Sequence, residues 1–237
     1  MKRGFTLAEV LITLSIIGIV AAMTLPALVN KYQAKVLETA FKKSYANLQN
    51  AYILTKSSLG VTNLKATYAL YDKDANKYPL AEEFFAEFKK NMKVINSVKF
   101  YPFKNYSGKK TMTSNVGADM PQALNILPDG SSIGFWINAS VIHLFIDTNG
   151  PYRKPNRYGF DIFSFVVDDS SDKIKPRKPT RKYTEEELEN EPWPELAGYP
   201  CDKTSAQGAN GVGCSWYAIN NINPDDETKT YWDNLPK

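Results

Sequence analysis

The N-terminal stretch constrains the fold of this chain more than any other part of its sequence. Lys2 and Arg3 precede a long apolar run, in which Glu9 is the only charged side chain between Phe5 and Leu25. About 20 helical residues, at a rise of ~1.5 Å each, span the ~30 Å hydrocarbon core of a bilayer. The stretch therefore predicts a transmembrane helix rather than a helix of a protein core.

A secretory signal peptide is the alternative for this stretch, with Lys2 and Arg3 as its charged region. The apolar run is long for such a peptide, and helical periodicity continues beyond Pro26. Basic residues before a membrane helix favour the cytoplasmic side. The pattern therefore predicts a single-pass protein with a cytoplasmic N-terminus and the rest of the chain outside.

The carboxylate of Glu9 needs a physical explanation in an apolar environment. A charge in hydrocarbon is costly and usually has a partner, yet no Lys or Arg occurs between Glu9 and Lys31. One explanation is local, because an acidic residue in the first turn interacts favourably with the helix dipole. The other is a cation on a second chain, such as an α-amino group that cleavage exposes.

The segment GFTLAE at Gly4–Glu9, with the apolar run that follows, resembles the class III signal of type IV prepilins and type II secretion pseudopilins. The resemblance covers residues 2–28. It implies that prepilin peptidase cleaves between Gly4 and Phe5 and that the new Phe5 amine is N-methylated. It also implies that Glu9 pairs with that amine in a neighbouring subunit.

The resemblance also implies where the protein is located and which partners it assembles with. The chain would be stored in the bacterial inner membrane and then assembled into a periplasmic or extracellular filament. Its partners would be other pilin or pseudopilin subunits, prepilin peptidase and an inner-membrane assembly platform. A carboxylate that only the next subunit's ammonium neutralises would set the axial offset between subunits.

Beyond residue 28 the helix is expected to continue as an amphipathic segment as far as Gly60, a residue typical of helix ends. Gly18 and Pro26 are candidate kink positions, because proline removes a backbone hydrogen bond and crowds the preceding turn. Apolar side chains recur at steps of three or four, which indicates a buried stripe. The stripe consists of Ala34, Leu37, Phe41, Tyr45, Leu48, Tyr52, Thr55 and Leu59.

Residues 61–128 predict a connection that contains one short helix after Pro79. Acidic residues precede lysines along this helix, as the helix dipole favours. Between Lys99 and Lys110, lysines alternate with aromatic residues, a pattern that suits either single-stranded nucleic acid or a solvated loop over buried rings. We expect the loop, and no nucleic-acid partner. The apolar stripe of the short helix is Leu80, Phe84, Phe88, Met92 and Ile95.

Residues 129–168 give the clearest strand pattern. Alternating apolar residues predict three antiparallel strands, with Asn138-Ala139-Ser140 closing the first hairpin. Such a sheet has one apolar face that a long amphipathic helix can cover. The expected fold is α+β, a pilin-like roll in which the N-terminal helix packs on a small antiparallel sheet. The alternating residues are Ile133, Phe135, Ile137, Ile142, Leu144, Ile146, Phe163, Phe165 and Val167.

The segment between the second and third strands carries oxygen-bearing side chains. Asp147 and Asn149 stand one residue apart before Gly150, as at the start of a calcium loop, and Asp161 follows. The terminal Glu of an EF-hand is missing. A tight connection of Asx-turns and glycines explains the same residues, so no cofactor is expected unless this segment binds calcium.

Residues 169–237 predict a charged excursion followed by a stapled C-terminal region. The part from Asp168 to Pro194 has few apolar residues to bury, which indicates an exposed segment. The two cysteines of an exported chain, Cys201 and Cys214, predict one disulfide. This region resembles the disulfide-bounded C-terminal region of type IV pilins.

No feature of the sequence favours an enzyme. The net charge is +4, and the single histidine, His143, lies within an alternating strand. The expected function is a structural subunit of a type II secretion pseudopilus or a type IV pilus. The alternatives are a minor pilin in adhesion or DNA uptake, and a membrane-anchored binding module or enzyme.

The expected segments are a leader (1–4), a transmembrane assembly helix (5–28), its amphipathic continuation (29–60), a connection (61–128), the sheet (129–168) and the C-terminal region (169–237).

Overall fold

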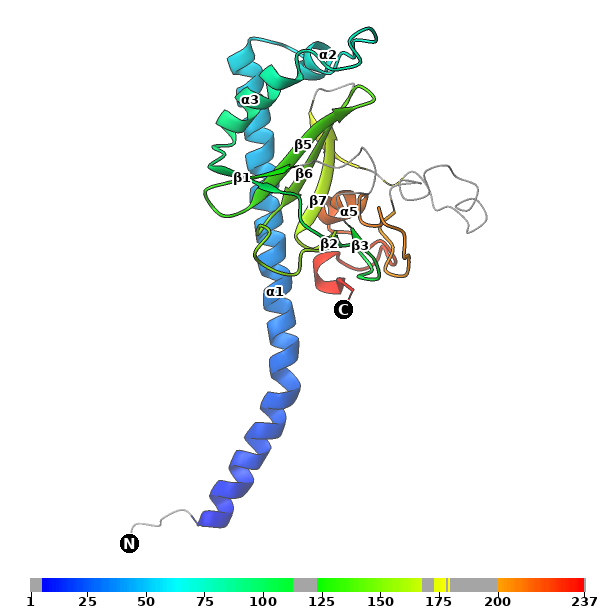
Figure 1. Ribbon diagram of the computed structural model, residues 1–237. Coiled ribbons are helices and arrows are strands. Elements are labelled where there is room, and N and C mark those ends of the chain that lie inside the picture. Colours follow the sequence, from blue (N-terminus) through cyan, green and yellow to red (C-terminus); the bar gives the residue numbers. More distant parts are fainter. Residues whose placement is uncertain (1–5, 113–122, 168–172, 178, 180–199, 237) are drawn as a thin grey trace. The chain divides into compact units, whose positions relative to one another are not determined.

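The structure is a computed structural model that describes residues 6–112, 123–167, 173–177, 179 and 200–236 (Figure 1). The chain divides into two compact units, Met1–Val36 and Leu37–Lys237. Helix α1 (Leu7–Leu59) contributes residues to both units. The predicted processing residues Gly4 and Phe5 lie outside the described part of the chain.

The first unit contains the N-terminal part of α1. Its apolar side chains are exposed, and none of the residues in its most apolar stretch is buried. By length and composition this helix can cross a membrane, a property that signal sequences share. The helix passes through Gly18 and Pro26 without interruption, so the kink expected there stays a prediction.

Helix α1 ends where the sequence indicates. Gly60 has a positive φ of 65°. Its N–H donates to Ser57 O, and the N–H of Val61 donates to Lys56 O, at 3.2 Å each. These two bonds satisfy carbonyls that the last turn leaves unpaired, as in a Schellman motif. The buried residues of α1 are Phe41, Leu48, Ala51, Tyr52 and Thr55, which confirms the predicted stripe.

The second unit contains a six-stranded antiparallel sheet with the strand order β1-β4-β5-β6-β7-β8. Its strands are β1 (Asn96–Lys99), β4 (Ala123–Ile126), β5 (Ser132–Asn138), β6 (Val141–Asp147), β7 (Ile162–Val167) and β8 (Ile174–Pro176). A separate pair is formed by β2 (Phe103–Lys104) and β3 (Thr111–Met112). Besides the part of α1 that begins at Leu37, the helices among the described residues of this unit are α2 (Leu64–Tyr68), α3 (Ala81–Asn91), α5 (Cys214–Asn220) and the 3-10 helix η1 (Trp232–Asn234).

The three predicted strands are confirmed as β5, β6 and β7. The hairpin between β5 and β6 closes through Ala139 and Ser140, which have positive φ values of 46° and 56°. This is the backbone of a type I′ turn, whose twist matches the strands it joins. Asn138 pairs with Val141 directly beside the turn.

Two expectations about the chain between these elements are wrong. Ile95 lies beyond the end of α3 and is 66% exposed, so it does not belong to the apolar stripe of that helix. Ile174–Pro176 forms β8 and Ile174 is 1% exposed, so this part of the charged segment is not an exposed excursion. Pairing with β7 accounts for the difference, since Ile174 lies opposite Val167, and Gln49 Nε2 also donates to Ile174 O at 2.6 Å. Residues 168–172, 178 and 180–199 of that segment lie outside the described part.

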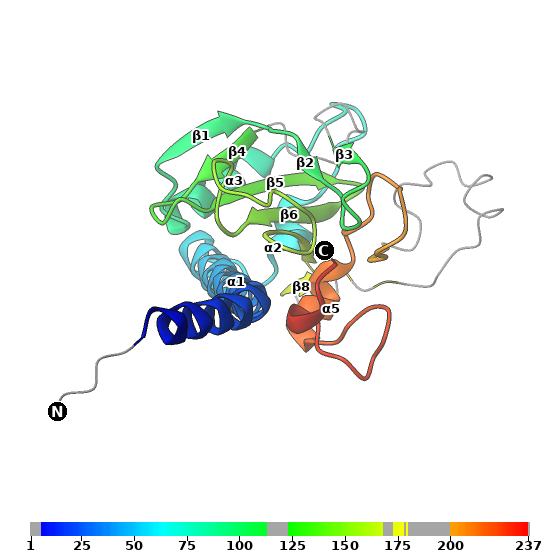
Figure 2. The ribbon, with the colours of Figure 1, turned by 90° about the horizontal axis from the view of Figure 1, so that it is seen from below.

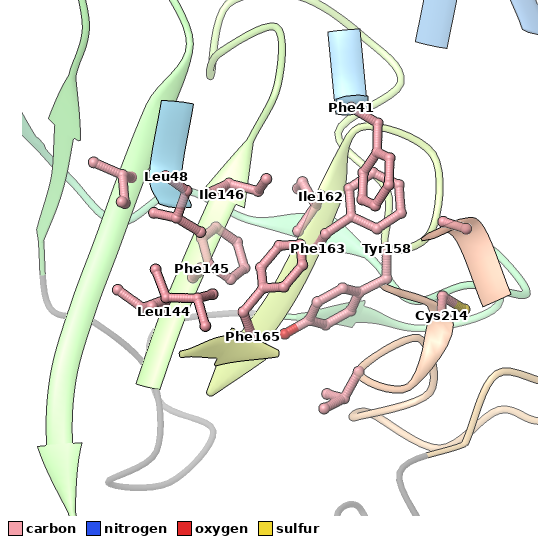
Figure 3. Close-up of a cluster of buried hydrophobic side chains, with 14 of the residues drawn as sticks. Phe41, Leu48, Leu144, Phe145, Ile146, Tyr158, Ile162, Phe163, Phe165 and Cys214 are labelled. Atoms are coloured by element: carbon pink, nitrogen blue, oxygen red, sulfur yellow. The ribbon is translucent and has the colours of Figure 1, made fainter. Parts of the chain in front are cut away.

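Side chains cover both faces of the sheet. On one face, Phe41 of α1 packs against Phe163 of β7 with ring centroids 4.4 Å apart (Figure 3). On the other face, Phe145 of β6 lies 5.4 Å from the ring of Phe103 and 6.1 Å from that of Tyr158. Strand β6 is therefore buried along nearly its whole length, although alternation predicted only one apolar face.

The C-terminal region belongs to this core. The predicted disulfide is formed between Cys201 and Cys214. Helix α5 packs on β7 and β8 (Figure 2), and its Ser215 Oγ donates to Ser164 O at 2.7 Å. Trp232 of η1 lies 5.4 Å from the Phe41 ring. The chain thus returns to the face of the sheet that α1 covers.

Candidate functional site

The first candidate site is the start of α1. Thr6 donates to Glu9 Oε2 from both its backbone N–H and its Oγ1, each at 2.8 Å. The Glu9 N–H is directed back to Thr6 Oγ1 at 3.3 Å. This reciprocal arrangement is a capping box, which satisfies N–H groups that the first helical turn leaves unpaired. Glu9 therefore has a hydrogen-bond partner within its own helix. This agrees with the explanation that an acidic residue stabilises the first helical turn.

One oxygen of the Glu9 carboxylate, Oε1, takes no part in the capping box. Only Oε2 contacts Thr6, and within the described residues Oε1 accepts no hydrogen bond. Cleavage between Gly4 and Phe5 would keep the Phe5–Thr6 peptide bond and so would leave the capping box intact. The local contact is consequently compatible with a second contact, from an ammonium group, at Oε1.

The second candidate site joins β6 to β7. We call Asp147–Asp161 the β6–β7 junction. Its end residues, Asp147 and Asp161, are both 0% exposed, and the N–H of Thr148 donates to Asp161 O at 2.8 Å. The charge of Asp147 acts on Asp161 and the Asn149 side chain hydrogen-bonds with it, so the structure brings together all three residues that the calcium pattern singled out.

Backbone groups orient both carboxylates. Asp147 Oδ1 accepts from the N–H groups of Asn149 at 3.1 Å and Gly150 at 2.8 Å, while Tyr101 Oη donates to Asp147 Oδ2. The Asp161 carboxylate accepts from the N–H groups of Asn156 and Arg157, each at 2.8 Å. Burial raises the pKa of both carboxyl groups, and the charge of Asp147 further raises the pKa of Asp161.

Asn149, the third residue of the calcium pattern, links the two acids. Its backbone binds Asp147, and its side chain hydrogen-bonds with Asp161. Sequence reasoning missed Tyr101 and Ser132 in this site, because only the folding of the sheet brings them here. Asn156 lies in the same oxygen-rich segment as the predicted residues and follows Pro155.

The remaining candidate residues form structural contacts. His143 is 8% exposed and its ring stacks on Trp136 at 4.9 Å. Of the basic aromatic segment, Phe103 and Tyr106 are buried while Lys104 and Lys109 are exposed. The rings are thus buried and the lysines solvated, as expected, but Phe103–Lys104 is strand β2 rather than loop. Among the described residues, no three His, Cys, Asp or Glu side chains gather where they could hold a metal ion, so any metal would need other oxygen ligands as well.

Comparison with known proteins gives one result for the N-terminus. Residues 1–25 match the family described as the prokaryotic N-terminal methylation motif. This motif is the class III signal of type IV pilins and pseudopilins, and it indicates a type IV pilin-like protein that prepilin peptidase processes. The resemblance seen in Gly4–Glu9 is confirmed. No curated protein and no solved structure matches the chain.

The match and the structure agree on the kind of protein. The motif occupies the start of a helix that can cross a membrane, and the same helix continues into an α+β unit with an antiparallel sheet and a disulfide. These features are pilin-like, and they are consistent with anchoring in the inner membrane. The motif implies processing by prepilin peptidase and assembly with other pilin subunits.

Proposed function

We propose that this protein is a subunit of a type II secretion pseudopilus or a type IV pilus and that it polymerises through the N-terminal part of α1. The carrying observation is the N-terminal methylation motif at residues 1–25, placed on a helix whose apolar side chains are exposed. Such a surface is stable only when lipid or other apolar helices cover it. A membrane covers it before assembly, and neighbouring subunits cover it in the filament.

Glu9 is the proposed register residue. Its Oε2 holds the helix start through Thr6, and its Oε1 pairs with the methylated Phe5 amine of the next subunit. An ion pair in an apolar filament core is costly to break, at about 3–5 kcal/mol when one partner is removed. Only one axial offset between subunits satisfies both charges, so the pair selects that offset.

The test separates the charge of Glu9 from its capping role. Glu9→Gln keeps an oxygen that accepts from Thr6 but removes the negative charge, whereas Thr6→Val removes the side-chain part of the cap and keeps the charge. We expect Glu9→Gln to be cleaved normally and to lose at least about tenfold in filament incorporation. Thr6→Val should incorporate within about twofold of the wild type, because one exposed cap contributes only ~1 kcal/mol. Mass spectrometry of the mature protein and sheared-filament blots measure the two steps.

Normal incorporation of Glu9→Gln would refute the register role, and equal losses for both variants would assign the effect to the cap. A mature protein that does not begin with methylated Phe5 would refute the processing step. A strain that lacks this protein distinguishes the two alternatives. Loss of hydrolase secretion indicates a pseudopilus, and loss of surface filaments indicates a pilus.

A further inference from the structure

Two neighbouring loops of the second unit carry basic but no acidic side chains. Neither residues 103–112, which form the β2–β3 hairpin, nor residues 148–160, between β6 and β7, contain Asp or Glu. The two loops are in contact, because the Lys104 N–H donates to Asn156 O and the Tyr158 N–H donates to Lys104 O, each at 2.9 Å. We call their basic side chains the basic surface. It consists of the exposed Lys104, Lys109, Lys110, Arg153 and Lys154 and the half-buried Arg157.

The basic surface has no ion-pair partner among the described residues, whose ion pairs all involve other lysines. The acids at the two ends of the β6–β7 junction, Asp147 and Asp161, are 0% exposed. Two more acids, Asp202 and Asp225, act on Tyr106 through their charges. Asp225 pairs with a lysine of its own region at 3.4 Å. The exposed charge of the two loops is therefore positive.

The basic surface lies at the end of the sheet where α1 enters the second unit. Phe41 of α1 packs against Phe163, the second residue of β7, with ring centroids 4.4 Å apart. A row of rings leads from there to the β2–β3 hairpin. Trp232 lies 5.4 Å from Phe41, Tyr231 lies 5.1 Å from Trp232, and Tyr231 stacks on Tyr106 at 6.4 Å.

The opposite end of the sheet has a different charge pattern. There the β5–β6 hairpin contacts residues 70–80, because the Ser140 N–H donates to Tyr78 Oη at 2.9 Å. The charged residues of this loop are Asp72, Lys73, Asp74 and Lys77, two of each sign. Positive charge is thus concentrated at the end where α1 enters.

Tyr152 extends from the same loop as Arg153 and Lys154. It is 86% exposed, the highest value among the large hydrophobic side chains that the structure leaves exposed. A tyrosine ring is amphipathic and favours the interface between membrane and water. Lys and Arg flank such rings at membrane surfaces, where their charges lie among the headgroups. This combination suits a lipid surface.

The connection to the apolar part of α1 keeps the basic surface near a membrane. The resemblance to prepilins ends at residue 28, and the second unit begins at Leu37. Residues 29–36 alone join the two parts, and a segment of this length reaches at most ~28 Å. Anionic lipids attract basic side chains that come within a Debye length, ~10 Å at 0.1 M salt. The end where the chain enters has the shortest tether to the lipid.

We propose that the basic surface binds anionic phospholipid headgroups of the membrane in which the chain is anchored. Its Lys and Arg side chains contact lipid phosphates, and the ring of Tyr152 lies among the headgroups. Each basic side chain near such a surface strengthens binding about fivefold. This inference rests on the membrane anchoring of α1 and not on polymerisation through Glu9.

The experiment uses the full-length chain in lipid nanodiscs of phosphatidylcholine, with or without phosphatidylglycerol. A neutral acylating reagent modifies exposed lysines, and mass spectrometry measures the rate at each one. Contact with lipid phosphates shields an ammonium group, so Lys104, Lys110 and Lys154 should react at least ~3-fold more slowly with the anionic lipid. Lys73 and Lys77 should react equally fast in both lipids. At ~1 M salt, where the Debye length is ~3 Å, the difference should disappear.

Two double variants with the same change of net charge test which end of the sheet binds. Lys110→Gln with Lys154→Gln removes two charges from the basic surface, whereas Lys73→Gln with Lys77→Gln removes two from the opposite end. All four side chains are exposed, so neither variant alters the core. The first should reduce the effect of anionic lipid on Lys104 to less than ~half, and the second should keep the full effect.

Three results would overturn the proposal. The first is an equal rate at Lys104, Lys110 and Lys154 in the two lipids. The second is an equal slowing at Lys73 and Lys77, which would show a general effect of the anionic bilayer on the reaction. The third is protection that requires other subunits rather than anionic lipid, which would assign the surface to a protein partner. A chain that does not insert into nanodiscs would refute the anchoring on which the proposal rests, whereas a failure of Glu9 in filament assembly would leave the lipid contact intact.

Discussion

His143 shows how a single residue acquires its properties from tertiary packing. Its ring stacks on Trp136 with the ring planes 9° apart, and the Arg177 guanidinium donates to its Nδ1. Burial, with the positive charges of Arg177 and Lys65, lowers the pKa of His143 to about 3, while a hydrogen bond to the backbone of Asn138 acts in the opposite direction. The imidazole therefore stays neutral in the folded protein.

This pKa predicts a loss of stability in acid. In the unfolded chain His143 takes up a proton near pH ~6.5, whereas the folded protein resists protonation until about pH 3. The unfolded state thus binds more protons between these values, and stability falls by up to about 1.4 kcal/mol per pH unit as the pH drops. His143→Phe keeps a ring against Trp136 and should lack this loss.

Urea unfolding of both proteins measures the effect. The difference in unfolding free energy between wild type and His143→Phe should be constant above about pH 7.5 and should shift by about 2 kcal/mol in favour of the variant by pH ~5. The comparison cancels the titration of carboxylates that the two proteins share. A difference that does not vary with pH would show that His143 is not held neutral.

At the level of elements, two loops at one end of the sheet touch through glycines. Gly150 of the β6–β7 junction has a φ of +82°, and a Cβ atom there would lie 1.9 Å from Gly130 O in the loop between β4 and β5. The Asp147 carboxylate fixes this approach by accepting from the Gly150 N–H. The two loops are therefore close enough that only glycine fits at position 150.

Gly150→Ala should lower the free energy of unfolding by more than about 3 kcal/mol, because the methyl group meets backbone and the positive φ adds strain. Gly130→Ala is a matched control, since Gly130 has a φ of +85° but open space around its Cβ position. The control should lose only about 1–2 kcal/mol. Equal losses in chemical denaturation would mean that backbone strain, not the loop contact, sets the cost.

At the level of the whole molecule, the two units differ in the exposure of the apolar side chains of α1. The N-terminal unit leaves its apolar side chains exposed, with Leu7 at 81% and Met23 at 75%. In the second unit, the part of α1 that begins at Leu37 buries its stripe against the sheet, with Phe41 1% exposed. The first surface suits lipid or other subunits, and the second stabilises the fold of the unit itself.

Substitution of Phe41 tests whether the buried part of α1 stabilises the second unit. Its ring lies against those of Phe163 and Trp232, so Phe41→Ala should leave a cavity and cost about 3–5 kcal/mol of unfolding free energy. Leu54 lies on the same helix but is 53% exposed, and Leu54→Ala should cost less than about 1 kcal/mol. Similar losses for both variants would contradict the packing of α1 on the sheet.

Local patterns in the sequence were enough for several features. The stripe of α1, its end at Gly60, and the β5–β6 hairpin follow from side-chain periodicity and turn chemistry over short stretches. Short edge strands lack such a pattern. Ile174 belongs to β8 because it pairs with Val167 of β7, and its carbonyl accepts from Tyr45 and Gln49 of α1. The contacts with α1 join residues more than a hundred positions apart, which no local pattern indicates.

The sequence by itself determined the processing signal, the apolar helix, its amphipathic continuation and the disulfide pair, because each depends on residue types at fixed short spacings. Only the tertiary structure decided that both faces of the sheet are buried and that Asp147 and Asp161 lie together with Ser132 and Asn156. Strand pairing creates these neighbours, and the register of a sheet depends on the packing of all its strands at once.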